Sequence, residues 1–192
     1  INELLLNCAI GNLRRVIKLL KNPIIRDNVT SSNNLALQYA ATFGRLNVVN
    51  YLLNIPEVME SIVIEDNAVL MAAIQRGQLI VIKRLLQITA VRENLLYNNF
   101  TVTLSHALRL HNFEVFSCLL DVYDDSLPFS LNFVLNTAIR LGNTRALARL
   151  LQVPSVQTSI SSDSVFFLNV AINEKQLSTF HALLAIPSVR AN

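Results

Sequence analysis

Apolar residues recur along this chain in short clusters at a nearly constant interval. The clearest marker is a pair of adjacent leucines, found in register at Leu19-Leu20, Leu52-Leu53, Leu85-Leu86, Leu119-Leu120, Leu150-Leu151 and Leu183-Leu184. The first leucines of successive pairs are 33, 33, 34, 31 and 33 residues apart. A fixed period of this length indicates a repeat architecture, in which neighbouring copies bury a shared core.

The glycines and prolines keep the same register. Eight residues before each leucine pair lies a position that we call the turn position: Gly11, Gly44, Gly77, His111, Gly142 and Lys175. These four glycines are all that the chain contains. Four of the five prolines follow a pair by three residues, and Pro128 lies elsewhere. Glycine is typical of a helix end with positive φ, whereas proline cannot easily continue a helix. Each repeat is therefore predicted to be a helix, a turn and a second helix that ends before the proline.

The second repeat illustrates the two helices. Leu37, Ala40 and Ala41 share one face of the first helix, and residues 46–53 form a second helix with one broad apolar face. Asn34 is predicted to cap the first helix, as are its counterparts Asn67 and Asn132. Alanine lies four residues before the turn position in five repeats, at Ala40, Ala73, Ala107, Ala138 and Ala171. We expect a neighbouring helix to pack closely against this alanine.

These patterns predict an all-α solenoid of about six stacked repeats. The approximate repeats are 1–27, 28–60, 61–93, 94–127, 128–158 and 159–192. The segments between repeats, such as residues 52–58, lack glycine-rich hairpins, so loops are predicted there. The chain begins without Met and ends within another linker pattern, at Pro187-Ser188-Val189. We therefore expect a fragment of a longer protein, with further repeats or another domain beyond it.

The segment from Ala40 to Leu53, AATFGRLNVVNYLL, resembles the core of the ankyrin repeat. The family's T-P-L-H entry is absent. The L-L-x-I-P-x-V linker, seen in residues 52–58 and 183–189, is similar to that of ankyrin-like effectors of intracellular bacterial pathogens. The resemblance implies an interaction module that binds a protein or peptide, such as a eukaryotic host protein, on a concave face. The two cysteines, Cys8 and Cys118, lie far apart in the sequence, which favours a reducing, cytoplasmic-type environment. The resemblance implies that this is the host cytosol, reached by a route without a signal peptide.

The resemblance to ankyrin arrays implies that the two residues just before each turn position lie on the binding face. The predicted partner-binding residues are Thr42, Phe43, Gln75, Arg76, Arg109, Leu110, Arg140, Leu141 and Asn173. Aromatic and arginine side chains often dominate binding energy at interfaces. An alternative interpretation is that Leu110 and Leu141 only complete the packing between repeats.

Catalytic and cofactor signatures are missing from the sequence. It contains no G-x-x-x-x-G-K-[ST], G-x-G-x-x-G, G-x-S-x-G or H-E-x-x-H motif. The histidines and the acidic segment around Asp124 do not have metal-ligand spacing. Cys8 and Cys118 are expected to be free thiols on helices. We therefore expect no enzyme activity, cofactor or metal, and an isolated chain that is monomeric.

Two other classes of function stay open. The repeats could recruit substrate for, or scaffold, an enzyme whose catalytic domain lies outside this segment. Alternatively, the net charge of +3 and the basic second helices could bind nucleic acid or an anionic membrane. The basic residues are Arg14, Arg15, Lys18, Lys21, Lys83, Arg84, Arg145 and Arg149. The sequence favours a solvated helix face instead, because aromatic residues for base stacking are not interleaved there.

Overall fold

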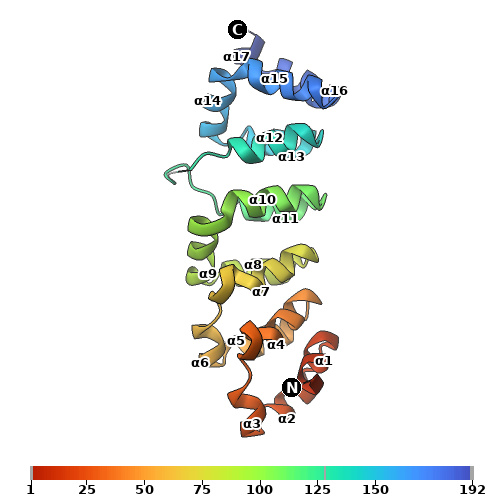
Figure 1. Ribbon diagram of the computed structural model, residues 1–192, viewed down its shortest axis with the longest axis vertical. Coiled ribbons are helices and arrows are strands. Elements are labelled where there is room, and N and C mark those ends of the chain that lie inside the picture. Colours follow the sequence, from red (N-terminus) through yellow and green to blue (C-terminus); the bar gives the residue numbers. More distant parts are fainter. Residues whose placement is uncertain (1, 128, 191–192) are drawn as a thin grey trace. The chain divides into compact units, whose positions relative to one another are not determined.

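The computed structural model of the protein describes residues 2–127 and 129–190, without the side chains of residues 64–66. Pro128, the proline outside the repeat register, lies outside the described residues. Every element within the described ranges is a helix, which confirms the all-α prediction (Figure 1). None of these helices is long and apolar enough to cross a membrane. The chain divides into two compact units, residues 1–99 and 100–192, and in each unit three turn positions separate pairs of consecutive helices.

The first unit has nine α-helices and one π-helical turn within its described residues. Its first helices are α1 (Asn2–Ile10), α4 (Ser31–Thr42) and α7 (Ile64–Gln75), and its second helices are α2 (Leu13–Leu19), α5 (Leu46–Leu53) and α8 (Leu79–Leu86). Short connecting helices follow: α3 (Pro23–Asp27), α6 (Pro56–Glu60) and α9 (Thr89–Asn94), which continues into η1 (Leu95–Asn99). Each first helix packs against the next first helix, and each second helix against the next second helix.

The second unit repeats this order. Its first helices are α10 (Phe100–Arg109), α12 (Asn132–Arg140) and α15 (Ser164–Asn173), and its second helices are α11 (Phe113–Leu120), α13 (Thr144–Leu150) and α16 (Leu177–Leu184). Two connecting helices follow, α14 (Pro154–Ser162) and α17 (Pro187–Arg190). The acidic segment between α11 and α12 has no helix in its described residues.

The connecting helices correct the prediction of loops between repeats. Pro23, Pro56 and Pro154 each occupy the start of a new helix rather than only ending the previous one. Proline is favoured at the first helical position because the backbone N–H that it lacks would have no acceptor within the helix there. In α6 and α14 the valine two residues after the proline anchors the helix, since Val58 and Val156 are both buried. A repeat thus has three helices where the connection follows the L-L-x-I-P-x-V pattern.

The turn position behaves as predicted in all six repeats. Gly11, Gly44, Gly77 and Gly142 have φ between 65° and 84°. His111 and Lys175 adopt the same left-handed backbone, with φ of 53° and 57°. The left-handed conformation is therefore set by the position in the repeat, and glycine only lowers the strain energy of adopting it.

Replacing His111 with glycine is expected to raise the free energy of unfolding of the second unit by about 1 kcal/mol. A left-handed residue with a Cβ costs roughly 1–2 kcal/mol, and glycine removes this strain but loses some chain entropy. Urea unfolding followed by circular dichroism measures the change. His111→Ala is the control, because alanine keeps the Cβ and should give no gain. Equal stabilisation by both variants would show that the imidazole itself, and not the backbone, is unfavourable.

The asparagines predicted as first-helix N-caps have a different role. The N-cap residues of α4 and α12 are Thr30 and Leu131. Asn34 is 2% exposed and left-handed, and its Nδ2 donates to Ser61 O at 3.0 Å. Asn67 Nδ2 likewise donates to Val91 O at 2.9 Å. The buried amides of Asn34 and Asn67 satisfy backbone carbonyls of the connecting segments and join helices within the unit instead of capping the first helices. Asn132 is the first residue of α12 and follows its N-cap Leu131, so the capping prediction is wrong.

The core lies between the two layers of helices in each unit. The alanines four residues before the turn, from Ala40 to Ala171, are all 0% exposed, as expected for a site of close helix packing. Across these contacts, long side chains link consecutive turns. Gln78 Nε2 donates to Thr42 O and Gln176 Nε2 donates to Arg140 O, each at 3.1 Å. Arg45 Nε donates to Ala9 O at 2.7 Å. These bonds tie the ends of α1, α4 and α12 to the following repeat of the same unit.

Candidate partner-binding surface

The predicted binding residues lie where the first helices end. The chain reverses direction at the turn position. The last residue of the first helix and the residue after it therefore lie at the C-terminal end of that helix. Thr42, Gln75, Arg109, Arg140 and Asn173 are the last residues of α4, α7, α10, α12 and α15. Carbonyl groups at a helix C-terminus carry partial negative charge, which suits arginine at this place. The nine predicted residues fall into two groups, one in each unit.

In the first unit, only part of the predicted surface is available to a partner. Thr42 is half-buried, and its Oγ1 donates to Gln38 O at 2.7 Å. Phe43 is 46% exposed and lies beside Tyr39, with ring centroids 6.5 Å apart. Gln75 and Arg76 are exposed. The aromatic pair, Gln75 and Arg76 are therefore the accessible groups here.

In the second unit, Arg109 and Leu110 are exposed, and so is Asn173. Arg140 Nη2 pairs with Glu174 Oε1 at 2.7 Å, an exposed ion pair between adjacent repeats. Leu141 is half-buried, whereas Leu110 is 41% exposed. Leu141 therefore fits the packing interpretation better than Leu110 does. Within the described residues, Arg109 has no carboxylate partner, so its charge is available to a ligand.

A second row of residues on the same helices was not predicted. Val102, Phe133 and Phe166 each lie nine residues before a turn position and are 60%, 53% and 54% exposed. Seven residues later on each helix come Arg109, Arg140 and Asn173, and a separation of seven returns to the same helix face. The first helices of the second unit thus present an apolar row followed by a largely basic row. The signal in the sequence was an apolar residue on the polar face in three successive repeats.

Three arginines of the basic second helices contact side chains of a neighbouring repeat. The Arg145 guanidinium carbon lies 3.8 Å from the Phe113 ring centroid, and Arg145 Nη2 is 3.1 Å from Glu114 Oε1. Arg149 Nη2 is 2.5 Å from Asp121 Oδ1. Arg84 Nε donates to Asn50 Oδ1 at 2.9 Å.

These contacts join α13 and α8 each to the second helix or adjoining residue of the previous repeat. They direct the guanidinium groups toward neighbouring repeats rather than toward a phosphate backbone, and so they weaken the argument for nucleic-acid binding.

The other titratable groups have structural surroundings. Neither cysteine forms a disulfide, and burial raises the pKa of the Cys8 thiol to about 12. Asp125 accepts hydrogen bonds from the Ser155 amide at 3.1 Å and from its hydroxyl at 2.5 Å. Desolvation by burial raises the pKa of Tyr123, whose ring stacks on Phe100 with centroids 5.8 Å apart. No three His, Cys, Asp or Glu residues within the described ranges gather as metal ligands would.

Comparisons with protein-family models, curated proteins and solved structures found no match to this chain. Its function is therefore inferred from its own residues.

Proposed function

We propose that this chain is a non-catalytic protein–protein interaction module with an ankyrin-like arrangement of repeats. The first helices of its second unit form the principal binding surface. The observation that carries the proposal is the apolar row Val102, Phe133 and Phe166, exposed in the same register of three successive repeats. Large apolar side chains usually lie inside a folded domain, and a repeated exposed set marks an interaction site.

The chemistry of the surface indicates the kind of partner. The apolar row would contact aliphatic or aromatic side chains, and Arg109 would pair with a carboxylate about ten ångströms further along the same face, the distance that seven helical residues span. Arg140 is already neutralised by Glu174, so a partner carboxylate would have to displace that exposed, weakly held pair. The preferred partner is therefore a protein or peptide segment that combines apolar and acidic residues.

A pair of matched double variants tests this surface. Phe133→Ala with Arg109→Glu removes one apolar anchor and reverses one charge. Ile80→Ala with Lys83→Glu makes comparable changes, the loss of one apolar side chain and the reversal of one charge, on the exposed face of α8, where Ile80 is 67% exposed. The immobilised proteins would be exposed to eukaryotic lysate, and proteins retained by the native chain would then be titrated against each variant by calorimetry.

We expect the first variant to bind at least about tenfold more weakly, since each central interface side chain contributes roughly 1–4 kcal/mol. The α8 variant should bind like the native chain, and both should keep native helical content. Equal affinity of the two variants would contradict the assignment of the surface. Loss only in the α8 variant, with a steep salt dependence, would favour the basic second helices instead.

A further inference from the structure

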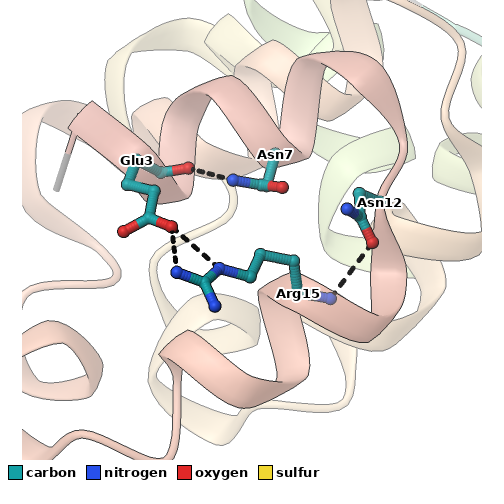
Figure 2. A network of polar contacts seen from close by, with 4 residues as sticks. All are labelled: Glu3, Asn7, Asn12 and Arg15. Atoms are coloured by element: carbon teal, nitrogen blue, oxygen red, sulfur yellow. Dashed lines mark hydrogen bonds and ion pairs between the residues drawn. The ribbon is translucent and has the colours of Figure 1, made fainter.

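The N-terminal end of the array is closed by polar side chains that later repeats do not have (Figure 2). Glu3 lies eight residues before its turn position, where later repeats bury Ala36, Val69, Thr103, Val134 and Phe167. Asn7 replaces the packed alanine. Arg15 lies four residues after the turn, where later repeats bury Val48, Val81, Val115, Ala146 and Thr179.

These polar residues bond to one another. Asn7 Nδ2 donates to Glu3 O at 2.7 Å, and Arg15 Nε donates to Glu3 Oε1 at 2.8 Å (Figure 2). Asn12 Oδ1 accepts from the Arg15 amide at 3.2 Å and caps α2. Terminal repeats of solenoids need a polar outer face of this kind because no further repeat covers them. The first repeat therefore presents a polar outer face, formed by Glu3, Asn7 and Arg15.

The last repeat keeps residues that are interior elsewhere. Three residues before the turn position, the side chain is at most 1% exposed in five repeats: Cys8, Ala41, Ile74, Leu108 and Ile139. Ile172 occupies this position in the sixth repeat and is 55% exposed. Leu177 is 69% exposed, and Phe180 is half-buried where the other repeats have a fully buried residue. These three side chains line an open hollow of about 350 Å³ together with Lys175 and His181.

Within the second unit, the equivalent face of the fifth repeat is covered by the sixth. Thr179 Oγ1 donates to Ile139 O at 3.4 Å, Gln176 Nε2 reaches Arg140 O, and Glu174 pairs with Arg140. Ile139 is 0% exposed as a result. We propose that the face formed by Ile172, Leu177 and Phe180 is a docking surface for a further helix-turn-helix repeat of the same class. This repeat would stack as the sixth stacks on the fifth.

The turn position adds a requirement for this occupant. The residue that follows the turn position of the next repeat packs over the glycine of the preceding turn. A Cβ added to Gly11, Gly44 or Gly142 would overlap this long side chain, which is Arg45, Gln78 or Gln176 respectively. Over His111, by contrast, the corresponding residue is Asn143, whose Oδ1 caps its own helix by accepting from the Ala146 amide at 2.9 Å. Lys175 also has a Cβ. A repeat that docks on it should therefore carry a short residue such as asparagine after its own turn.

A second copy of this chain suits the face less well. Docking the polar outer face of its first repeat there would bury the Glu3–Arg15 ion pair against Ile172 and Leu177. Both charged groups would then lose water without gaining new polar partners. Pairing two copies of the face itself would bring two Lys175 side chains into one apolar contact. A repeat with an apolar leading face avoids both costs.

The experiment appends a seventh repeat to the full chain. A copy of residues 160–192 is fused after Asn192, which continues the register, because position 192 corresponds to position 159 one repeat earlier. In one protein the copy carries Gln176→Asn, and in the matched control it keeps glutamine. Amide hydrogen exchange of residues 172–180 of the host repeat is compared in both fusions and in the unfused chain.

In the asparagine fusion, we expect the host amides to exchange roughly tenfold more slowly, the factor that burying one aliphatic side chain supplies. The slowing of exchange should be smaller in the glutamine fusion. Lys175→Gly in the host repeat should restore the full slowing in that fusion. Ile172→Glu in the host should abolish protection in both fusions. Unchanged exchange with an unfolded appended repeat would overturn the proposal. So would a dimer of the unfused chain in sedimentation that Ile172→Glu dissociates, because the occupant would then be a second copy.

Discussion

Phe116→Ala is expected to lower the free energy of unfolding of the second unit by about 3–5 kcal/mol, the usual cost of removing a buried phenyl ring. Phe116 lies on α11, is 0% exposed and is among the largest fully buried side chains. Its ring is 6.1 Å from that of Phe113, centroid to centroid. Alanine would leave a cavity between two layers of helices that are fixed by neighbouring repeats, so little collapse is possible. Urea unfolding monitored by circular dichroism gives the difference.

Phe133→Ala is the matched control for this loss. The same ring is removed from the same unit, but Phe133 is 53% exposed on α12. Surface substitutions of this kind usually change the free energy of unfolding by less than about 0.5 kcal/mol. If Phe133→Ala destabilised the unit as much as Phe116→Ala, then Phe133 would be part of the core and the binding row would lose its central residue.

The second large effect is expected at the turn of the fifth repeat. Gly142→Ala should destabilise the second unit by about 2–3 kcal/mol, combining left-handed strain with the loss of one hydrogen bond. Gly142 has φ of 65°, and a Cβ built on it would overlap Gln176 Oε1. Gln176 would have to leave, and its bond to Arg140 O would break. Thermal and urea unfolding measure the loss.

A double-mutant cycle separates the two causes. Gln176→Ala alone should cost about 1 kcal/mol, the typical contribution of one hydrogen bond. When Gln176→Ala is combined with Gly142→Ala, the total should fall about 1 kcal/mol short of the sum, because the bond is lost only once. Strict additivity would show that the glutamine does not contact the turn in solution.

The turn position was the most predictable feature of the fold. Its register was visible in four glycines, and its backbone conformation holds even at His111 and Lys175. Such turns are local, since a helix must stop and reverse within a few residues. The packed alanines were predictable for a similar reason, because a small side chain at a fixed place in the repeat implies a close neighbour.

Other local patterns were misinterpreted because two outcomes share one signal. A proline after the leucine pair is compatible with ending one helix and with starting the next, and Pro56 starts α6. Asparagine is a residue type favoured at helix N-caps, but the side-chain amide of Asn34 donates to Ser61 O in the connecting segment. Which partner an asparagine finds depends on which carbonyl lies within reach, and that is set by packing between helices.

The candidate surface was only partly predictable. The helix-tip residues such as Arg109 could be located from the turn position, but Val102, Phe133 and Phe166 were not recognised. A single apolar residue on a polar helix face is common, and only its exposure in three successive repeats gives it meaning. The ion pair between Arg140 and Glu174 was also hidden, because it joins residues of different repeats.

The sequence by itself determined the helical class, the period and the place of every turn, because these depend on local backbone preferences and on the spacing of apolar residues. Only the tertiary structure decided which faces are covered. Glu3 and Ile172 hold positions that are buried in other repeats, yet one lies in a polar network and the other remains exposed. Burial depends on whether a neighbouring repeat is present, so the free energy of a side chain depends on its tertiary surroundings as well as on its identity.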